Sequence, residues 1–412
     1  MSVLIKNDLA TRRLYATDAS VYEELPQSVV FPKNTEECVA LVKGARKNKM
    51  PLIFRAAGTS IAGQCVGGGQ VVDVSQFLTG ILGEHKDHTI KVQPGVIHSD
   101  LDLFLKPFDL KFAPEISTSN RCMIGGMIGN NAAGSHSVVY GTTREHVIAI
   151  EALLSDGSVV EFGPLTDDEL SNKCTLKTLE GEIYRTVTSI INQHRTLILK
   201  RYPKPEIIRR NTGYPLDVLA KGQPWVKSGP LFNLAPFLCG SEGTLAFTLS
   251  ATLKLVEIPK AKGLSCIHFS SLEQAMVAIS VILKHQPAAI ELMDKRLLAL
   301  TENHLAHRRN RQWIEGAPEA VLAVEFLGDS DSKIKTCFKK LTADLKQRQL
   351  GYAYPVIAKE NAPKVWAIRK AGLGLLMGVG QLKKPVAVKK IYLQLPIEIK
   401  TLKWQKMLLI LP

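Results

Sequence analysis

The spacing of apolar residues along the chain switches between a helical and a strand-like period. Residues 36–49 place apolar side chains three or four positions apart, which predicts a helix that opens after Thr35 as the capping candidate. Short apolar runs at 51–56, 70–74 and 90–92 predict strands instead. The order of these elements predicts a strand–helix–strand unit in the N-terminal part of the chain.

The middle of the chain has the pattern of antiparallel strands. Residues 147–162 contain two apolar, β-branched runs separated by Asp156 and Gly157, and this dipeptide is a strong signal for a hairpin turn. Residues 243–258 alternate apolar and polar side chains, which predicts a half-buried antiparallel strand. A proline follows this strand, and we place a domain boundary near 259–263.

The strand–helix–strand theme returns after the boundary. Apolar runs at 264–270, 288–294 and 320–328 predict strands, and the stretches 271–285 and 331–350 have helical spacing. This order predicts a second α+β layer, smaller than the first.

Composition narrows the class of protein. The chain has 412 residues, of which 45% are hydrophobic and 22% charged, so it resembles an ordinary globular chain with enough residues for a large core. Its longest apolar runs, Ala275–Leu283 and Ala371–Gly380, are shorter than the roughly 18 residues that span a bilayer. The N-terminus shows no secretory signal, and the seven cysteines lack metal-ligand or redox spacing. We therefore expect reduced thiols and a cytoplasmic protein.

The net charge of +14 suggests a nucleic-acid or membrane-surface partner. The charge is unevenly placed, however, because residues 381–412 hold seven lysines and Glu398 as their one acid. A basic tail thus supplies much of the charge. We therefore rank a basic nucleic-acid-associated protein third among the possible functions of this chain. We expect no nucleic-acid partner.

Two loops poor in large side chains carry the candidate chemistry. The first follows a predicted strand and offers backbone N–H groups and hydroxyls that suit a phosphate. Judged by its glycine spacing alone, this loop is as consistent with a plain surface turn as with a phosphate site. The second could lie against a large flat ligand, and its alternative is a packing segment. The first loop is Arg55-Ala56-Ala57-Gly58-Thr59-Ser60-Ile61-Ala62-Gly63-Gln64, and the second is residues 114–135.

Together the two loops resemble the flavoprotein fold shared by vanillyl-alcohol oxidase and the flavin domain of para-cresol methylhydroxylase (PCMH). In detail the chain is similar to FAD-linked D-2-hydroxyacid dehydrogenases, the enzymes of D-lactate, glycolate and D-2-hydroxyglutarate. The landmarks run in family order: Phe31-Pro32, Thr35-Glu36-Glu37, RAAGTS-x-x-GQ, Val92-Gln93-Pro94-Gly95, IGGMIGNNAAG, Tyr140-Gly141, Asp156-Gly157 and Gly240-Ser241-Glu242-Gly243-Thr244-Leu245.

The resemblance implies an α+β fold: a PCMH-type FAD-binding domain of two α+β subdomains, followed by an incomplete ferredoxin-like α+β cap domain. The implied parts are an N-terminal segment at 1–25, the FAD-binding domain at 26–259, a partial FAD-linked oxidase C-terminal (cap) domain at 260–378, and an unmatched basic tail at 379–412. The tail resembles an out-of-frame or truncated end. A membrane-binding basic end is the alternative for it, which would place the protein at the inner membrane.

The resemblance also implies which residues contact FAD. The pyrophosphate would be held by Arg55, Ala56, Ala57, Gly58, Thr59 and Ser60, and Gly63 and Gln64 would finish that turn. The flavin would lie near Pro94, Ser119, Ile124, Gly125, Gly126, Asn130 and Gly134, with the adenine at Val147 and Ile148 and the isoalloxazine side closed by Gly240, Glu242 and Gly243.

Two departures from the family pattern bear on the cofactor. Relatives that bind flavin covalently often place histidine at the position of Ser60, so we expect non-covalent FAD. The usual glycine is replaced by Ala57, which is tolerable only at a negative φ.

The resemblance places the substrate site in the second domain. The segment Val365-Trp366-Ala367-Ile368-Arg369-Lys370 resembles the family's Trp-x-x-Arg segment, in which arginine grips the substrate carboxylate. Its alternative is a solvated arginine on an amphipathic helix. The HxGDGNxH motif that usually provides metal and base is missing, and His304 and His307 lie in a strongly basic stretch, so no metal site is predicted.

The implied function is oxidation of a D-2-hydroxy acid to the 2-keto acid, with hydride transfer to flavin N5. Electrons would pass on to a quinone, a cytochrome or a flavoprotein. The alternative is a non-catalytic FAD-binding fragment whose cap is too short to work.

Overall fold

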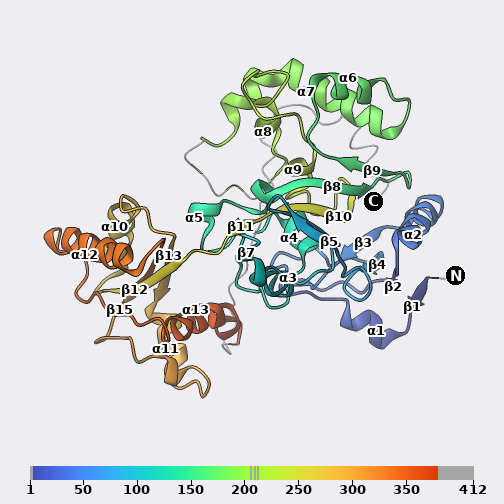
Figure 1. Ribbon diagram of the computed structural model, residues 1–412. Coiled ribbons are helices and arrows are strands. Elements are labelled where there is room, and N and C mark those ends of the chain that lie inside the picture. The colour runs from blue at the N-terminus through green and yellow to red at the C-terminus, as the bar shows by residue number, and fades with distance from the viewer. Residues whose placement is uncertain (1–2, 205–206, 208–209, 211–212, 379–412) are drawn as a thin grey trace. The chain divides into compact units, whose positions relative to one another are not determined.

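The computed structural model describes all residues except 1–2, 205–206, 208–209, 211–212 and 379–412 (Figure 1). The predicted basic tail therefore lies outside the described residues. The chain forms two compact units. The first holds the described residues up to Ala133 together with Gly141–Val256. The second begins at Glu257 and also takes in the short stretch Gly134–Tyr140, which the sequence alone did not predict.

The first sheet of the first unit is the predicted strand–helix–strand unit. Its strand order is β1-β2-β4-β3, in which β2, β4 and β3 are parallel and β1 is antiparallel to β2. The strands are β1 (Leu4–Lys6), β2 (Ser28–Phe31), β3 (Leu52–Arg55) and β4 (Gln70–Asp73), with helices α1 (Leu9–Leu14) and α2 (Thr35–Asn48).

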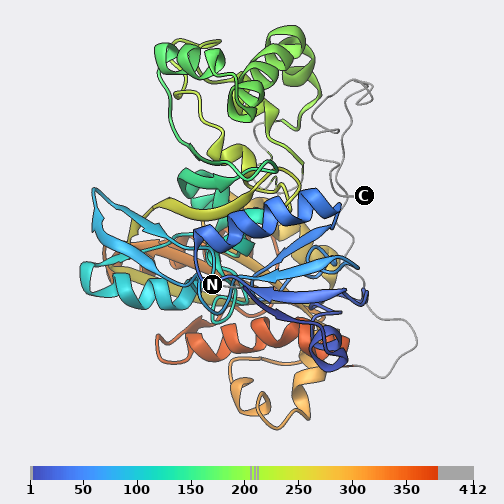
Figure 2. The same cartoon turned by 90° about the vertical axis from the view of Figure 1, so that its right-hand side faces the viewer.

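Helix α2 begins one residue earlier than the capping candidate implies. Asn34, not Thr35, is the N-cap, and its side chain accepts a hydrogen bond from the backbone N–H of Glu37 at 2.9 Å. Thr35 is already helical, so its hydroxyl is one position too late to cap. Figure 2 shows α2 lying across the strands of this sheet.

The second sheet of the first unit is antiparallel, in the order β5-β6-β10-β8-β9. It contains the predicted hairpin, with Asp156 and Gly157 between β8 and β9. The strands are β5 (Ile81–Lys86), β6 (Thr89–Val92), β8 (Val147–Leu153), β9 (Val159–Phe162) and β10 (Phe247–Lys254), and the short β7 (Leu110–Lys111) and β11 (Val256–Glu257) lie outside this sheet.

The central strand β10 is buried on both faces, whereas the alternation at 243–258 predicted a half-buried strand. The reason is that apolar groups cover each side. Leu249 packs with Cys38 of α2, and Ala251 lies in the larger core beyond the sheet. Phe247 stacks on Phe54 of β3 at 3.9 Å, so the two sheets share an aromatic contact.

Helices fill the rest of the first unit. Helices α6, α7 and α8 gather at its far end, at the top of Figures 1 and 2. The helices are α3 (His98–Leu105), α4 (Ile124–Asn130), α6 (Asp167–Thr175), α7 (Leu179–Arg201), α8 (Leu216–Ala220) and α9 (Ala235–Leu238), with 3-10 turns at Lys106–Phe108 and Thr143–His146.

The second unit has a ferredoxin-like arrangement, as predicted. Its elements β12-α10-β13-β14-α12-β15 form an antiparallel sheet in the order β13-β14-β12-β15. Helices α10 and α12 cover one face, and α11 and α13 cover the other. The bounds are α5 (Ser137–Tyr140), β12 (Ala261–Phe269), α10 (Leu272–Leu283), β13 (Ala289–Asp294), α11 (Lys295–Glu302), β14 (Ala320–Gly328), α12 (Asp331–Gln347), β15 (Val356–Ile357) and α13 (Ala362–Met377), with a 3-10 turn at Arg308–Asn310.

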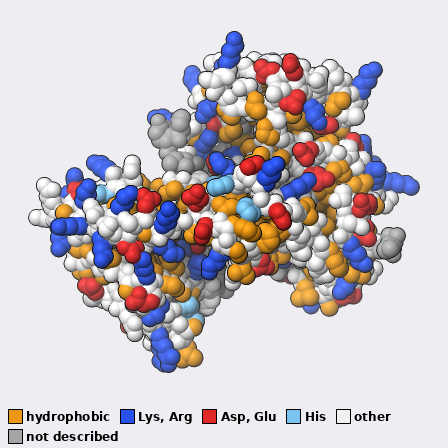
Figure 3. All heavy atoms as spheres, in the orientation of Figure 1, with side chains coloured by type: hydrophobic (Ala, Val, Ile, Leu, Met, Phe, Trp, Pro, Cys, Tyr) orange, Lys and Arg blue, Asp and Glu red, His pale blue; other side chains and the backbone are white. Residues whose placement is uncertain are grey.

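The surface and the thiols agree with an ordinary globular protein. All seven cysteines are free, as expected. The face in Figure 3 shows Lys and Arg side chains interspersed with Asp and Glu. The helices of the described residues include none that is long and apolar enough to cross a membrane.

Candidate functional site

The first glycine-rich loop begins where β3 ends, at Arg55. Its guanidinium group lies over the ring of Tyr15 at 5.2 Å and donates from Nη1 to the carbonyl of Thr17 at 2.7 Å. A Cβ at Gly58 would stand 2.5 Å from Nη2 of this arginine. Gly58 also has φ 63°, and this backbone conformation favours glycine here. Arg55 therefore braces the loop from within.

Ala57, which replaces the family's usual glycine, has the backbone conformation that an alanine requires. Ala57 does not take a positive φ, whereas Gly58 and Gly63 do. The alanine is therefore compatible with the turn, because the left-handed conformation falls on the two glycines.

The two loops meet in the folded chain. The hydroxyl of Ser60 donates to Oε1 of Gln64 at 2.5 Å, and Nε2 of Gln64 donates to Oδ1 of Asn130 at 3.0 Å. Asn130 is the last residue of α4. This chain of hydrogen bonds ties the first loop to the second across 66 positions of sequence.

Helix α4 packs closely because two glycines follow Ile124 in its first turn. The N–H of Gly125 donates to the carbonyl of Pro94 at 2.8 Å, and a Cβ at Gly125 would stand 2.5 Å from Cβ of that proline. A Cβ at Gly126 would contact Ala56 of the first loop at 3.6 Å. One at Gly129 would meet nothing within 4 Å. The helix thus has one tightly packed side and one open side of bare backbone.

The segment at 240–243, which was predicted to lie beside the isoalloxazine, contacts the end of α4. The N–H of Gly240 donates to the carbonyl of Ile128, and the N–H of Glu242 donates to that of Gly129, both at 2.9 Å. Gly240, Glu242 and Gly243 all have positive φ, which for a glutamate is uncommon. The segment therefore adopts a tight, constrained turn beside α4.

Other predicted residues have contacts outside these three segments. The carbonyl of Ile148 accepts from the side chain of Asn233 at 2.8 Å, and Val147 is buried in the large core. The carbonyl of Ser119 accepts from the N–H of Ser99. Gly134 belongs to the second unit, where its N–H donates to the hydroxyl of Ser137 at 2.9 Å.

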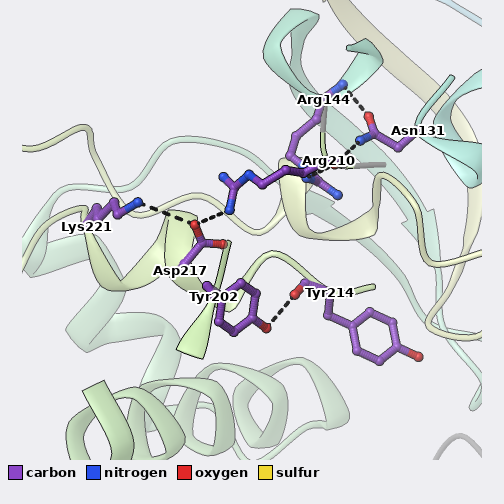
Figure 4. A network of polar contacts seen from close by, with 7 residues as sticks. All are labelled: Asn131, Arg144, Tyr202, Arg210, Tyr214, Asp217 and Lys221. Atoms are coloured by element: carbon purple, nitrogen blue, oxygen red, sulfur yellow. Dashed lines mark hydrogen bonds and ion pairs between the residues drawn. The ribbon is translucent and has the colours of Figure 1, made fainter. Parts of the chain in front are cut away.

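A buried arginine network holds the end of α4 and was not predicted from the sequence. Arg144 donates from Nη2 to the carbonyl of Cys239 at 2.7 Å. Its backbone N–H donates to Oδ1 of Asn131 at 2.9 Å, as Figure 4 shows. Burial lowers the pKa of Arg144. The side chain of Asn131 also donates to the carbonyl of Arg210. The guanidinium group of Arg210 pairs with Asp217, with 2.6 Å between Nη1 and Oδ2.

This network explains why the 240–243 turn stays against α4. Arg144 satisfies the carbonyl just before the turn, and Asn131, in the left-handed conformation, ends the helix. The sequence neighbours of Arg144 are polar and its partners are distant along the chain, so no local pattern signalled this buried role.

The predicted substrate arginine lies on α13 in the second unit. Its Nε donates to Oε2 of Glu291 on β13 at 2.5 Å. The side chain of Arg369 is 38% exposed and that of Glu291 is 17% exposed.

A second acid–base pair of this unit was not predicted. His136, next to α5, pairs with Glu325 on β14, and both side chains are buried. Glu325 is the single acid of the apolar strand β14, and Glu291 lies between apolar residues of β13. An acid among apolar strand residues is the sequence signal that could have found both pairs. The described residues contain no group of three or more His, Cys, Asp or Glu side chains that could hold a metal ion.

Comparison with known proteins gives two family matches. Residues 26–163 match the family described as FAD binding domain, and residues 258–391 match FAD linked oxidases, C-terminal domain. The second match extends beyond Gly378, where the resemblance was expected to stop.

Several relatives share most of this chain. It is 34% identical to a D-2-hydroxyglutarate dehydrogenase of Pseudomonas putida over 91% of its length and 32% identical to one of Escherichia coli over 92%. It is 25% identical to a D-lactate dehydrogenase of Anaerostipes hadrus over 84%. The chain spans 38% of the length of the first two relatives and 61% of the third.

A solved structure shares the fold. An alkyldihydroxyacetonephosphate synthase matches with a TM-score of 0.60 at 15% identity, covering 90% of this chain and 62% of the synthase.

Proposed function

The chain carries the FAD binding domain and the C-terminal domain of the FAD linked oxidases, and from this we propose that it is an FAD-dependent dehydrogenase of D-2-hydroxy acids. The relatives named D-2-hydroxyglutarate dehydrogenase and D-lactate dehydrogenase support this class of substrate. The observation that carries the proposal is the hydrogen bond between Gln64 and Asn130, since it joins the two loops that would share one dinucleotide.

The residues of the first unit fit FAD. Gly58 and Gly63 turn the backbone of the first loop, and we propose that the N–H groups around Gly58 and the Thr59 hydroxyl bind the diphosphate. The N–H groups of Ala62 and Gln64 already donate to the hydroxyl of Ser60. The open side of α4 at Gly129 and the free space at Gly243 leave backbone that a flat ring system can approach. We propose that FAD is held here without a covalent bond, because Ser60 cannot form one.

In the proposed reaction, this chain's own residues bind and orient the substrate. When bound, FAD supplies the hydride acceptor. Arg369 binds the carboxylate of the hydroxy acid, and its charged, planar fork suits a carboxylate better than a lysine would. Electrons would then pass to a quinone, a cytochrome or a flavoprotein.

Anaerobic flavin bleaching tests the proposal. The purified chain should be yellow, with an absorbance band at about 450 nm. D-2-hydroxyglutarate or D-lactate should bleach this band, and the L enantiomers should not. A yellow protein that no 2-hydroxy acid bleaches would support a flavin-binding chain without this activity, and a colourless protein that also fails to take up added FAD would contradict the proposal altogether.

A further inference from the structure

Glu291 is an unusual residue for its position. Along β13, the residues Ala289, Glu291 and Met293 point to one face of the sheet, because side chains alternate along a strand. Met293 belongs to the apolar cluster that this face forms with Val365 and Ile368 of α13. A carboxylate here loses much of its hydration. A positively charged partner is therefore needed to stabilise it.

That partner is Arg369, and the form of the contact is informative. Oε2 of Glu291 accepts from Nε of the guanidinium group at 2.5 Å. Within the described part of the chain, Nη1 and Nη2 of Arg369 donate no hydrogen bond. A guanidinium group has five N–H donors, and a carboxylate ligand is best met by two parallel ones. The contact through Nε leaves the outer edge of the fork available for such a ligand.

The contact also limits where the arginine can point. A long side chain that is 38% exposed has many rotamers in water, and freezing them on binding weakens the binding. Val365 and Ile368, on the same helix, are fully buried, so the backbone that carries Arg369 is fixed. Glu291 then fixes the far end of the side chain from the neighbouring strand.

We propose that Glu291 is a positioning residue: it holds Arg369 by Nε so that the outer edge of the guanidinium group is oriented to receive the substrate carboxylate. This inference rests on the proposed function, because it assigns Arg369 to the substrate. The competing hypothesis is that Glu291 pairs with Arg369 in place of the substrate and so blocks it. That hypothesis predicts that substitution of Glu291 tightens carboxylate binding instead of weakening it.

The test is carboxylate binding by the full, FAD-loaded chain. Oxalate and 2-oxoglutarate are titrated by calorimetry and by the change in flavin absorbance. Glu291→Ala should raise both dissociation constants by roughly tenfold, since a hydrogen bond to a charged group is lost. Glu291→Gln keeps an oxygen acceptor for Nε, so the increase should be smaller, about threefold.

Asp344→Asn is the matched control. Asp344 accepts from Nε of Arg348 at 2.7 Å on α12, which is the same chemistry on the opposite face of the same sheet. This variant should change the carboxylate dissociation constants by less than about twofold. The FAD content of every variant should equal that of the unsubstituted chain, which separates positioning from a general loss of structure.

The outcomes distinguish the inference from the proposed function. Unchanged or tighter carboxylate binding by the Glu291 variants, with the unsubstituted chain bleached by a D-2-hydroxy acid, overturns the inference alone. A flavin-loaded unsubstituted chain that neither binds carboxylates nor is bleached overturns both. If Glu291→Ala does not fold, Glu291→Gln carries the test, because its side chain has the same size.

Discussion

Gln64 is the residue that links the two halves of the proposed FAD site. Its amide accepts from Ser60 and donates to Asn130, so both ends of one side chain are used. A single neutral hydrogen bond contributes about 1 kcal/mol, which would be small in a rigid core. Here it sets the distance between two loops that otherwise consist mostly of backbone and small side chains, so we expect its loss to affect the cofactor.

Gln64→Ala should therefore weaken FAD binding about fivefold, the equivalent of about 1 kcal/mol. Fluorescence titration of the apo chain with FAD measures the change. Gln70→Ala is the control, because Nε2 of Gln70 donates to Ser28 at 2.9 Å in the same unit but away from the loops. Equal weakening by both substitutions would argue against a specific role for Gln64.

His268 makes the stability of the second unit depend on pH. Its Nδ1 bonds to the carbonyl of Cys266, and its Nε2 accepts from the N–H of Glu315, so both contacts suit the neutral ring. Burial lowers the pKa of His268 below 6.5. The unfolded chain thus takes up a proton that the folded chain does not, and stability present above pH 6.5 is lost as the pH falls below it.

The urea midpoint of unfolding should consequently drop between about pH 7 and about pH 5.5. His268→Gln should lower the midpoint at neutral pH, because two buried contacts are disturbed, but should reduce its pH dependence. If the pH dependence of this variant matches that of the unsubstituted chain, another group is responsible.

At the scale of elements, helix α4 is shaped by which of its glycines are crowded. Gly125 lies against Pro94, where a Cβ would come within 2.5 Å of the proline side chain and 3.1 Å of its backbone. Gly129, on the same helix, has no such neighbour. The two positions therefore separate the packing requirement from helix propensity.

Gly125→Ala should destabilise the apo chain by about 1–3 kcal/mol, because the helix must move away from Pro94. Gly129→Ala should leave stability unchanged or raise it by up to about 1 kcal/mol, since alanine favours the helix. Urea unfolding of the apo proteins measures both. Similar losses at the two positions would show that the packing of α4 is not as the structure describes.

At the scale of the whole molecule, each unit has its own core. The large cluster around Ile150 and Tyr184 belongs to the first unit, and the clusters around Phe269 and Met293 belong to the second. Separate cores permit separate unfolding transitions. The proposed FAD contacts, except Gly134, all lie in the first unit.

Calorimetry should accordingly show two unfolding transitions. FAD should raise the midpoint temperature of only one of them, that of the first unit. A ligand present at a hundred times its dissociation constant stabilises the unit that binds it by about 2.7 kcal/mol. Chains carrying Gln64→Ala should show a smaller shift of the same transition. A single transition, or an equal shift of both, would contradict independent units with FAD bound by one.

Much of the fold was predictable because its signals are local. The hairpin at Asp156-Gly157 and the strands and helices of the second unit follow from turn chemistry and from the period of apolar residues. Two predictions were wrong for different reasons. The cap of α2 is Asn34 instead of Thr35, which is a local error of one position. Strand β10 is buried on both faces because tertiary packing, not the period of apolar residues, decides burial. The domain limits and the individual FAD contacts remain predictions.

The amino-acid sequence by itself determined the α+β class, the two glycine-rich loops and the candidate arginine at position 369, since these depend on residue type and spacing within short stretches. Only the tertiary structure decided the partners: Gln64 with Asn130, Arg144 with Cys239, His136 with Glu325 and Arg369 with Glu291. Each pair joins residues 66 or more positions apart. Such contacts depend on strand register and on how elements pack, which no local pattern specifies.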